Sequence, residues 1–433
     1  MKLYQLFQTC SGVTTDSRHC PEGSLFMALK GESFDGNTFA AQALNDGCAY
    51  AVIDEPRYAV EGDSRYILVE DSLDALQQLA HYHRRQMGTK VIGITGTNGK
   101  TTTKELMATV LSQSYNVLYT LGNLNNHIGV PLTLLRLTKE HDFAIIEMGA
   151  NHLGEINTLA TIADPDYGII TNVGKAHLEG FGSFEGVIRT KGELYEYLRK
   201  KGKTSIFIWN DNPYLRNMAW DIPQIAYGTG DSLYINGQVA GNSPLLAFKW
   251  KNSNDGVPYQ VQTQLIGAYN LPNALAAITV GFFFGVNPEK INKALEAYIP
   301  QNNRSQLKKT AANTLIIDAY NANPTSMAAA LENFKNMSAP HKVVILGDMR
   351  ELGTESAAEH QKVIDYMDTC HFEQVFLVGE NFAATRHTYI SYMNVQELIA
   401  AFQTSARPIT GKTILIKGSN GVKLGQVVEF LSC

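Results

Sequence analysis

Two patterns of apolar and polar positions alternate along this chain of 433 residues. Short apolar runs that end at glycine or polar residues indicate buried strands, whereas longer stretches with apolar residues three and four positions apart indicate helices. Their alternation predicts an α/β fold in which helices cover mainly parallel sheets. The predicted strands span 24–29, 49–53, 66–69, 91–94, 143–146, 167–173, 314–317, 342–346, 374–378 and 413–416, and the predicted helices 37–44, 72–86, 183–200 and 267–286.

The length of the chain points to about three domains of ordinary size. A predicted helix that leads into Gly88 marks the first boundary, and the polar residues that follow Pro300 mark the second. We therefore predict a first domain at 1–87, a central domain at 88–302 and a C-terminal domain at 303–433. The segment 204–258 mixes strand and turn signals, and little can be assigned within it.

The composition argues against several classes of protein. The net charge of −5 leaves no excess of lysine and arginine to neutralise a nucleic-acid backbone, so we expect no nucleic-acid binding. The five cysteines are widely spaced and form no C-x-x-C pair, which fits a reducing cytosol better than a disulfide framework or a zinc site. The N-terminus does not resemble a signal peptide, and the most apolar run, 275–286, is too short to span a bilayer. We expect a cytoplasmic protein without membrane insertion.

The most informative stretch is 90–111, where an apolar run leads into G-T-N-G-K-T-T and then into a helix-periodic segment. Strand, glycine-rich turn and helix are the context that a phosphate-binding loop requires. The Lys100 ammonium would reach the terminal phosphates of a nucleotide, and the Thr101 hydroxyl would bind Mg²⁺. The general pattern has another glycine where this chain has Ile94, so a plain glycine turn before a surface helix is the alternative. The predicted nucleotide-binding residues of the loop are Gly96, Thr97, Asn98, Gly99, Lys100, Thr101 and Thr102.

Two strand ends and one helix supply candidate metal ligands. Glu147 and His177 follow successive predicted strands, and the carboxyl ends of parallel strands line the ligand crevice. Glu147 is either a Mg²⁺ ligand or a strand-end carboxylate in water. The case for His177 is weaker, because imidazole is a less usual ligand for Mg²⁺ than a carboxylate. Lys191 falls on the apolar stripe of the helix at 183–200. Either its stem reaches water, or its amine is desolvated enough to react with CO₂ and form an anionic carbamate.

Other polar segments have both a ligand-binding and a structural interpretation. Side-chain amides at 123–126 and at the start of the helix at 267–286 could bind polar groups of a ligand. Alternatively, they could stabilise turns and cap the helix. The segments 16–18 and 25–36 could dock a phosphorylated sugar, although solvated turns carry the same residues. In the last domain, Asp318 and other polar residues follow strands and would gather at one edge of a doubly wound sheet.

Together these stretches resemble the Mur ligase family over nearly the whole chain. The most specific shared motifs, in chain order, are F-x-A-L-K-G-E-x-F-D-G, G-T-N-G-K-T-T, G-N-L-N-N-x-I-G-V-P-L-T, E-M-G-A-N, N-V-G-x-A-H-L-E-x-F-G-S, D-A-Y-N-A-N-P-T-S-M and L-G-D-M-R-E-L-G. The resemblance is greatest to the family members that add D-alanyl-D-alanine. It implies a three-domain architecture with an N-terminal UDP-sugar module, a central P-loop ATPase domain and a C-terminal Rossmann-like domain.

The resemblance also implies an activity. ATP would phosphorylate the terminal carboxylate of UDP-N-acetylmuramoyl-tripeptide, and the amine of D-alanyl-D-alanine would attack the acyl phosphate to give the UDP-linked pentapeptide precursor of peptidoglycan. The implied cofactors are ATP and Mg²⁺, and we expect a monomer.

The same resemblance implies roles for individual residues. It assigns Lys100, Glu147, His177 and Lys191 to catalysis, with Thr101, Glu147, His177 and carbamylated Lys191 as metal ligands. It adds four residues to the nucleotide site formed by the loop: Asn270, Asn273, Arg304 and Asp318. It assigns the UDP-sugar to Asp16, Ser17, Arg18, Lys30 and Gly31, and the peptide substrates to Asn125, Asn126 and Asn321.

Two positions depart from the family pattern, and other interpretations compete with this one. Tyr269 stands where relatives commonly have histidine, and K-G-S at 417–419 is followed by N-G-V-K, to which we assign no role. The competing interpretations are another ligase of the superfamily, such as the enzyme that adds the third residue or a folylpolyglutamate synthase, and a nucleotide-dependent switch. The D-A-Y-N-A-N-P motif and the amide-rich loop argue against the ligase alternatives. A switch requires neither a UDP-sugar module nor convergent metal ligands.

Overall fold

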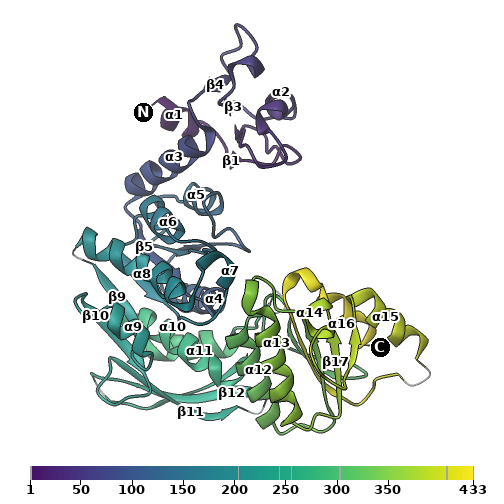
Figure 1. Ribbon diagram of the computed structural model, residues 1–433. Helices are drawn as coiled ribbons and strands as arrows, with labels where there is room; N and C mark the ends of the chain where they lie inside the picture. The colour runs from purple at the N-terminus through teal and green to yellow at the C-terminus, as the bar shows by residue number, and fades with distance from the viewer. Residues whose placement is uncertain are drawn as a thin grey trace.

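The computed structural model describes residues 2–202, 204–242, 244–254, 256–301, 304–405 and 408–432. Within these ranges the chain forms three successive β-sheets with helices packed against them, and the first sheet and the C-terminal sheet lie on different sides of the central one (Figure 1). The α/β class with mainly parallel sheets is as predicted. The predicted boundary between 302 and 303 lies outside the described residues.

The first sheet is parallel and has the strand order β1-β2-β3-β4. Its central strands are apolar on both faces: Phe26 and Ala51 pack against helix α2, while Leu25 and Met27 face the rest of the molecule. The predicted helix at 37–44 is a 3₁₀ turn followed by a shorter α-helix. The elements are α1 (Lys2–Phe7), β1 (Val13–Thr14), β2 (Leu25–Met27), η1 (Gly36–Phe39), α2 (Ala40–Asn45), β3 (Tyr50–Ile53), η2 (Pro56–Tyr58) and β4 (Tyr66–Leu68).

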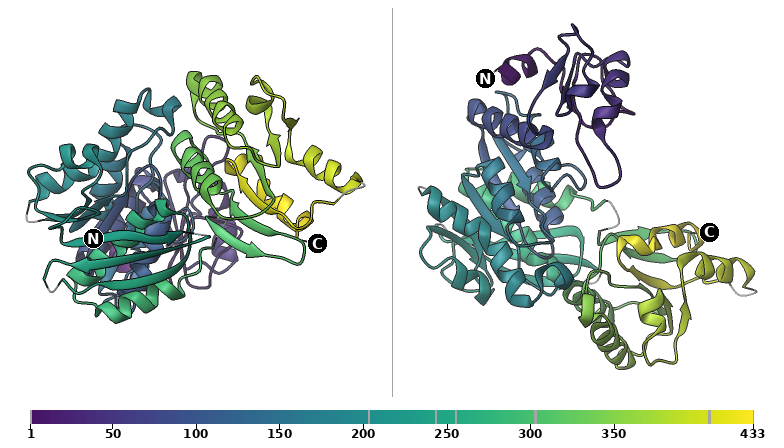
Figure 2. Two further views of the ribbon diagram at one scale, coloured as in Figure 1. Left: turned by 90° about the horizontal axis from the view of Figure 1, so that it is seen from below. Right: turned by 45° about the horizontal axis from the view of Figure 1, so that its top comes forward.

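Helix α3 (Ser72–Met87) joins the first sheet to the central domain (Figure 2). The Asp71 side chain caps its start. Gly88 ends it in the left-handed conformation, at the position where the sequence predicts the end of the helix. Leu76 and Leu79 belong to one apolar core that continues from the first sheet into the central domain. The helix therefore packs on both domains.

The buried side chain of Arg84 fixes this junction. Its guanidinium donates hydrogen bonds to Asp166 Oδ2 at 2.7 Å and to the Ala163 carbonyl oxygen at 3.0 Å. The same carboxylate oxygen accepts from the Val91 N–H at 2.9 Å, so helix α3 and the first strand of the central sheet share one anchor. The anchor ties together segments far apart in the chain.

Replacing Arg84 with Met is expected to lower the free energy of unfolding by about 2 kcal/mol, because a buried carbonyl and a partly buried carboxylate each lose a partner. The expected loss of unfolding free energy is moderate because Asp166 is partly exposed and also pairs with Lys201. Urea unfolding followed by circular dichroism measures the change. Arg85, an exposed neighbour on the same helix, provides the matched control R85M. Equal losses in the two variants would contradict the anchor.

The central sheet has the strand order β13-β12-β11-β10-β9-β8-β5-β7-β6 and is parallel from β6 to β11, with β12 and β13 added antiparallel. Much of the segment 204–258, to which the sequence assigned little, forms strands of this sheet. The strands are β5 (Lys90–Thr95), β6 (Val117–Tyr119), β7 (Phe143–Glu147), β8 (Tyr167–Ile170), β9 (Ser205–Trp209), β10 (Gln224–Gly228), β11 (Ile235–Asn242), β12 (Leu245–Asn252) and β13 (Tyr259–Ile266).

Helices cover both faces of the central sheet, and each face has its own apolar core. One core includes α3, α5, α6 and α8, and the other includes α4, α10 and α11. Within the described ranges no helix combines the length and the apolar character needed to cross a lipid bilayer. The helices are α4 (Lys100–Leu111), α5 (Gly129–Leu134), α6 (Glu155–Ala163), α7 (Leu178–Phe181), α8 (Phe184–Lys201), α9 (Pro213–Met218), η3 (Ala268–Asn270), α10 (Leu271–Phe283) and α11 (Pro288–Ala297).

The C-terminal sheet has the order β14-β15-β19-β16-β17-β18 and is parallel except for β14. Asn323 caps α12 and Pro324 occupies its first turn, as predicted. The strands are β14 (Gln306–Lys309), β15 (Thr314–Asp318), β16 (Lys342–Gly347), β17 (Gln374–Val378), β18 (Ile390–Tyr392) and β19 (Thr413–Lys417). The helices are α12 (Pro324–Asn336), η4 (Gly353–Glu355), α13 (Ser356–Asp368), α14 (Glu380–Ala383), α15 (Val395–Thr404), η5 (Asn420–Val422), η6 (Leu424–Gln426) and α16 (Val427–Phe430).

Candidate active site

A cavity of about 1300 Å³ is lined by residues of both the central and the C-terminal domains. It lies at the carboxyl ends of β5 and β7 and of β15 and β19, where parallel sheets bind ligands. The sequence-predicted residues that line it are Thr97, Asn98, Gly99, Lys100, Thr101, Thr102, Asn125, Asn126, Glu147, His177, Asn270, Asn273, Arg304, Asp318 and Asn321. Those that do not line it are Gly96, Lys191, Asp16, Ser17, Arg18, Lys30 and Gly31.

The loop between β5 and α4 has the strand–turn–helix context of a phosphate site. Gly96 and Gly99 have φ angles of +141° and +77°. A Cβ atom would lie 2.0 Å from Thr171 Oγ1 at Gly96 and 2.6 Å from Asn273 Oδ1 at Gly99. Both positions therefore require glycine, for backbone conformation and for close approach.

The predicted strand at 167–173 is too long, and the reason lies in this loop. β8 ends at Ile170, and the next two residues turn to support the loop. Thr171 Oγ1 donates to the Asn98 carbonyl oxygen at 2.6 Å, and Asn172 Oδ1 accepts from the Asn98 N–H at 2.9 Å. Both residues line the cavity, and the pattern of apolar positions gave no sign of this role.

Lys100 is folded back onto its own loop. Its Nζ donates to the carbonyl oxygens of Gly96 at 2.6 Å and Thr97 at 3.2 Å. Burial lowers the pKa of Lys100, an effect that nearby Glu147 opposes. The ammonium is thus held by carbonyl groups at the place where a phosphate would lie.

The Glu147 carboxylate lies beside the first turn of α4, and several donors surround it. Thr101 Oγ1 lies 3.0 Å from Oε2 and 3.2 Å from Oε1, and Asn125 Nδ2 donates to Oε1 at 3.0 Å. A hydroxyl beside a carboxylate supplies the hard oxygen donors that Mg²⁺ prefers, so the residues present fit this ion. Among the described residues no three His, Cys, Asp or Glu side chains group to hold a metal unaided. Water molecules and the phosphate oxygens of a nucleotide would complete the shell of the ion.

His177, the residue before α7, lines the cavity, and Lys191 lies on α8. The Nδ1 atom of His177 lies 2.5 Å from Glu351 Oε2 of the C-terminal domain, and this pairing lowers the pKa of the Glu351 carboxyl. Lys191 is only 2% exposed, as its place on the apolar stripe predicts, and its Nζ lies 5.1 Å from the centroid of the Phe181 ring. Burial, and to a lesser extent Lys100, lowers the pKa of Lys191 to about 7.

The amides at the start of α10 tie helices together. Asn273 Nδ2 donates to Asn270 Oδ1 at 2.8 Å, and Asn273 Oδ1 accepts from Thr103 Oγ1 of α4 at 3.1 Å. Asn270 Nδ2 donates to the Ile266 carbonyl oxygen at 2.8 Å, and its side chain does not cap the helix. These contacts give both residues a structural role at the cavity wall, whether or not they also meet a base.

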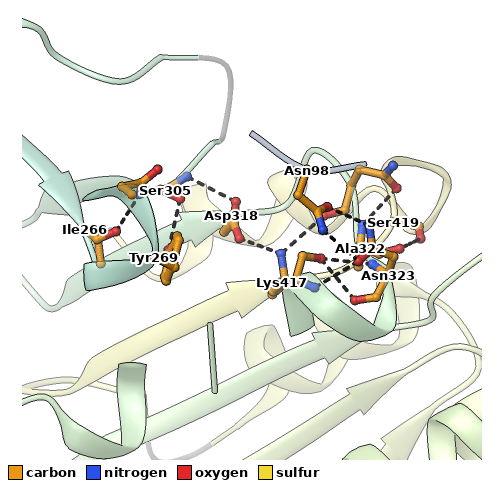
Figure 3. Close-up of polar contacts among 12 residues, drawn as sticks. Asn98, Ile266, Tyr269, Ser305, Asp318, Ala322, Asn323, Lys417 and Ser419 are labelled. Carbon is orange, nitrogen blue, oxygen red and sulfur yellow. Dashed lines mark hydrogen bonds and ion pairs between the residues drawn. The ribbon is translucent and has the colours of Figure 1, made fainter. Parts of the chain in front are cut away.

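Asp318 and Arg304 bring the C-terminal domain to the cavity. Asp318 Oδ2 accepts from the buried Lys417 at 2.6 Å, and its Oδ1 accepts from the Ser305 N–H at 3.2 Å (Figure 3). The Arg304 guanidinium stacks on the Tyr320 ring at 3.6 Å. The ion pair between Asp318 and Lys417 joins the ends of neighbouring strands β15 and β19, a neighbour relation that the sequence order does not reveal.

Direct contacts join the phosphate loop and its surroundings to the C-terminal domain. Figure 3 shows Asn98 facing Asn323, whose Nδ2 donates to Asn98 Oδ1 at 2.7 Å. Lys175 pairs with Glu359 at 3.0 Å. Together with the pairing of His177 and Glu351, these contacts dock the C-terminal domain beside the loop. The sequence motifs contain Asn98, His177, Asn323 and Glu351 but do not indicate their partners.

The five predicted UDP-sugar residues lie in the first domain. Arg18 donates to both carboxylate oxygens of Asp16, at 2.8 and 2.9 Å, on the surface. Lys30 pairs with Asp54 and Glu55, each at 3.0 Å. Gly31 allows the Phe34 ring to approach to within 2.3 Å of where a Cβ atom would lie. Their role in binding remains a prediction.

A glycine-bounded loop between a buried strand and a helix, with a lysine, a hydroxyl and a carboxylate gathered at it, defines a P-loop nucleotide-binding enzyme. Family models match almost the full length: a Mur ligase family catalytic domain at 9–84, a Mur ligase middle domain at 94–281 and a Mur ligase glutamate ligase domain at 303–420.

Full-length relatives agree with these matches. The chain is 37% identical over 432 residues to the UDP-N-acetylmuramoyl-tripeptide–D-alanyl-D-alanine ligase of Bacillus subtilis (strain 168), covering 97% of this chain and 93% of that protein. A crystal structure of MurF from Acinetobacter baumannii has a TM-score of 0.88 at 31% identity, covering 100% of this chain and 98% of that one. The MurF ligase of Thermotoga maritima in complex with ADP has a TM-score of 0.86 at 25% identity, with 99% and 98% covered. The chain belongs to the Mur ligase family of ATP-dependent ligases.

Proposed function

We propose that this enzyme joins D-alanyl-D-alanine to UDP-N-acetylmuramoyl-tripeptide, with ATP as the phosphoryl donor and ADP and phosphate as the other products. The observation that carries the proposal is the shared cavity, in which the phosphate loop and Glu147 meet Arg304 and Asp318 of the C-terminal domain. The full-length similarity to ligases of this name supports the choice of substrates.

The chemistry has two steps. An oxygen of the tripeptide carboxylate attacks the γ-phosphorus of ATP, the bond to the ADP oxygen breaks, and an acyl phosphate forms. The amine of D-alanyl-D-alanine then attacks the acyl carbon, the C–N bond forms, and phosphate leaves as the amine loses its proton. Because the reacting groups carry their own chemistry, the protein contributes positioning, charge neutralisation and exclusion of water.

The residues of the phosphate loop would bind the nucleotide. Lys100 would release its carbonyl partners and pair with the terminal phosphates, and Arg304 would approach them from the C-terminal domain. Thr101 and Glu147 would hold Mg²⁺, which when bound neutralises phosphate oxygens during phosphoryl transfer. Asp318, held by Lys417, would bind the ribose, and Asn270 and Asn273 would lie at the adenine.

The remaining predicted roles concern a second metal and the substrates. We propose that His177 and a carbamate on Lys191 hold a second Mg²⁺, supported by the burial and the lowered pKa of Lys191. Asn125, Asn126 and Asn321 would face the peptide ends. The UDP-sugar would bind in the first domain at Asp16, Ser17, Arg18, Lys30 and Gly31. We also propose that the enzyme acts as a monomer in the cytoplasm, where ATP is available.

The test is phosphate release from ATP in the presence of Mg²⁺. We expect release only when UDP-N-acetylmuramoyl-tripeptide and D-alanyl-D-alanine are both present, with a UDP-linked pentapeptide as product by mass spectrometry. D-Alanine in place of the dipeptide is the control and should give little release. Release that is indifferent to both substrates would favour a nucleotide-dependent switch instead.

A further inference from the structure

Lys104 is a buried lysine of α4 that the proposed mechanism does not use. Its side chain is 1% exposed, and its Nζ lies 3.6 Å from Glu147 Oε2. The same ammonium lies 5.9 Å from the centroid of the Tyr119 ring. A buried ammonium is unfavourable unless a partner compensates for its lost hydration. The pairing with Glu147 supplies that compensation, at the carboxylate that faces the phosphate loop.

The periodicity of α4 explains why Lys104 reaches this carboxylate. Residues three and four apart on a helix share a face, so Lys104 lies on the same face as Thr101 and Lys100. Thr101 donates to Glu147 from one turn earlier in the helix. The pairing is therefore built into the helix that begins at the phosphate loop.

The contacts around Glu147 divide between its two oxygens. Oε1 accepts from Asn125, Oε2 faces Lys104, and the Thr101 hydroxyl lies within 3.2 Å of both. The Glu147 backbone N–H donates to Thr120 Oγ1 at 3.0 Å, which fixes the residue from the neighbouring strand end. The carboxylate thus has one orientation, and one of its oxygens faces a cation.

This arrangement opposes the entry of a bare divalent cation. Lys100 and Lys104 both lie near the carboxylate, and the described residues offer no group of three acidic or imidazole ligands to outweigh them. A nucleotide changes the balance, because its phosphates would engage Lys100 and bring their own negative charge.

We propose that Lys104 is a positioning residue that orients Glu147 and makes metal binding at this carboxylate depend on the nucleotide. The inference rests on the proposed function of Thr101 and Glu147 as metal ligands. The metal then enters together with the nucleotide and does not bind first.

The test measures Mn²⁺ binding, as a stand-in for Mg²⁺, by electron paramagnetic resonance of the free ion in the absence of substrates. Wild-type protein is expected to bind Mn²⁺ weakly without nucleotide and tightly with ADP, once the Mn²⁺ that ADP binds in the absence of protein has been subtracted. The variant Lys104→Met is expected to bind Mn²⁺ without nucleotide about tenfold more tightly than wild type, because a nearby positive charge is removed. If Lys104 had only a structural role, K104M would bind Mn²⁺ more weakly than wild type or with equal affinity.

Three further variants locate the effect. Lys104→Arg keeps the cation and should behave as wild type, and Lys90→Met, which removes an exposed lysine at the start of β5, should do the same. Adding Glu147→Gln to K104M should abolish the gain. Circular dichroism shows whether K104M folds, and Lys104→Gln takes its place if K104M does not fold.

Equal Mn²⁺ affinities of wild type and K104M without nucleotide would overturn the inference, as would tight binding to nucleotide-free wild type. The outcome is separate from the proposed activity. If the wild-type enzyme ligates but K104M shows no gain in Mn²⁺ affinity, only this inference is rejected. If the wild-type enzyme fails to ligate but K104M shows the gain in Mn²⁺ affinity, only the proposed substrates are rejected.

Discussion

Replacing Lys100 with Met is expected to lower kcat of the ligation by about 10²–10³-fold, because the transition state loses a positioned charge at the phosphates. Steady-state phosphate release with saturating substrates measures the change. The variant should keep its fold, since the carbonyl partners of Nζ lie in a loop beside the cavity where water replaces the ammonium. Lys90→Met, which changes an exposed lysine of the preceding strand, is the matched control and should retain wild-type kcat.

The position of the Lys100 ammonium in this structure predicts a second effect of K100M, on the binding of ATP. Its ammonium already lies against the Gly96 and Thr97 carbonyls, so binding of ATP exchanges these neutral partners for phosphate charge. We therefore expect K100M to weaken the binding of ATP as well, seen as a raised KM. A K100M enzyme with kcat within a factor of about three of wild type would show that the amine does not act on the phosphates, since a lost charge contact costs far more.

Replacing Lys191 with Ala is expected to reduce ligation by at least about 10²-fold, because a proposed anionic ligand of the second metal is lost. A short carboxylic acid such as formate or acetate should restore part of the activity by occupying the space of the missing carbamate. Mass spectrometry under native conditions should also detect one added CO₂ in wild type and none in K191A. Full activity of K191A without added acid would exclude the role.

The stability of a Lys191 variant separates this catalytic role from a structural one. Burial lowers the pKa of Lys191 to about 7, whereas an unfolded chain has the ordinary lysine value of about 10.4. Between these values the unfolded chain binds more protons, so the contribution of the unmodified amine makes folding stability rise with pH across this window. Lys191→Met removes that contribution. We expect K191M to be inactive yet at least as stable as wild type at pH 7 by thermal unfolding.

Local pattern predicted the regular elements well where strands are continuous apolar runs and helices carry an apolar stripe. The strand, loop and helix between 90 and 111 and the helix that ends before Gly88 lie where the sequence predicts them. The prediction was weakest at 204–258, where strands at the side of the sheet alternate polar and apolar residues among frequent turns. It was wrong at the end of β8, because Thr171 and Asn172 serve the loop and not the sheet.

Some partners of the cavity residues could have been anticipated and others could not. Lys104 follows Thr101 at a helical spacing of three, so its place on the phosphate-facing side was available from the sequence. Glu351 gave no comparable signal, whereas Lys417 follows a predicted strand and was expected at the same sheet edge as Asp318, but not as its direct partner. Glu351 meets His177 only when two domains dock, and Lys417 meets Asp318 only because β19 lies beside β15.

By itself the sequence determined the family, the α/β class, the phosphate loop and the type of reaction, because each is encoded in contiguous motifs with local periodicity. The tertiary structure alone decided which side chains meet: Lys104 with Glu147, Glu351 with His177, Asn323 with Asn98. Such pairings depend on strand order, on side-chain reach and on the docking of domains. Periodicity reports which face of an element is buried, but it carries no information about the partner that buries it.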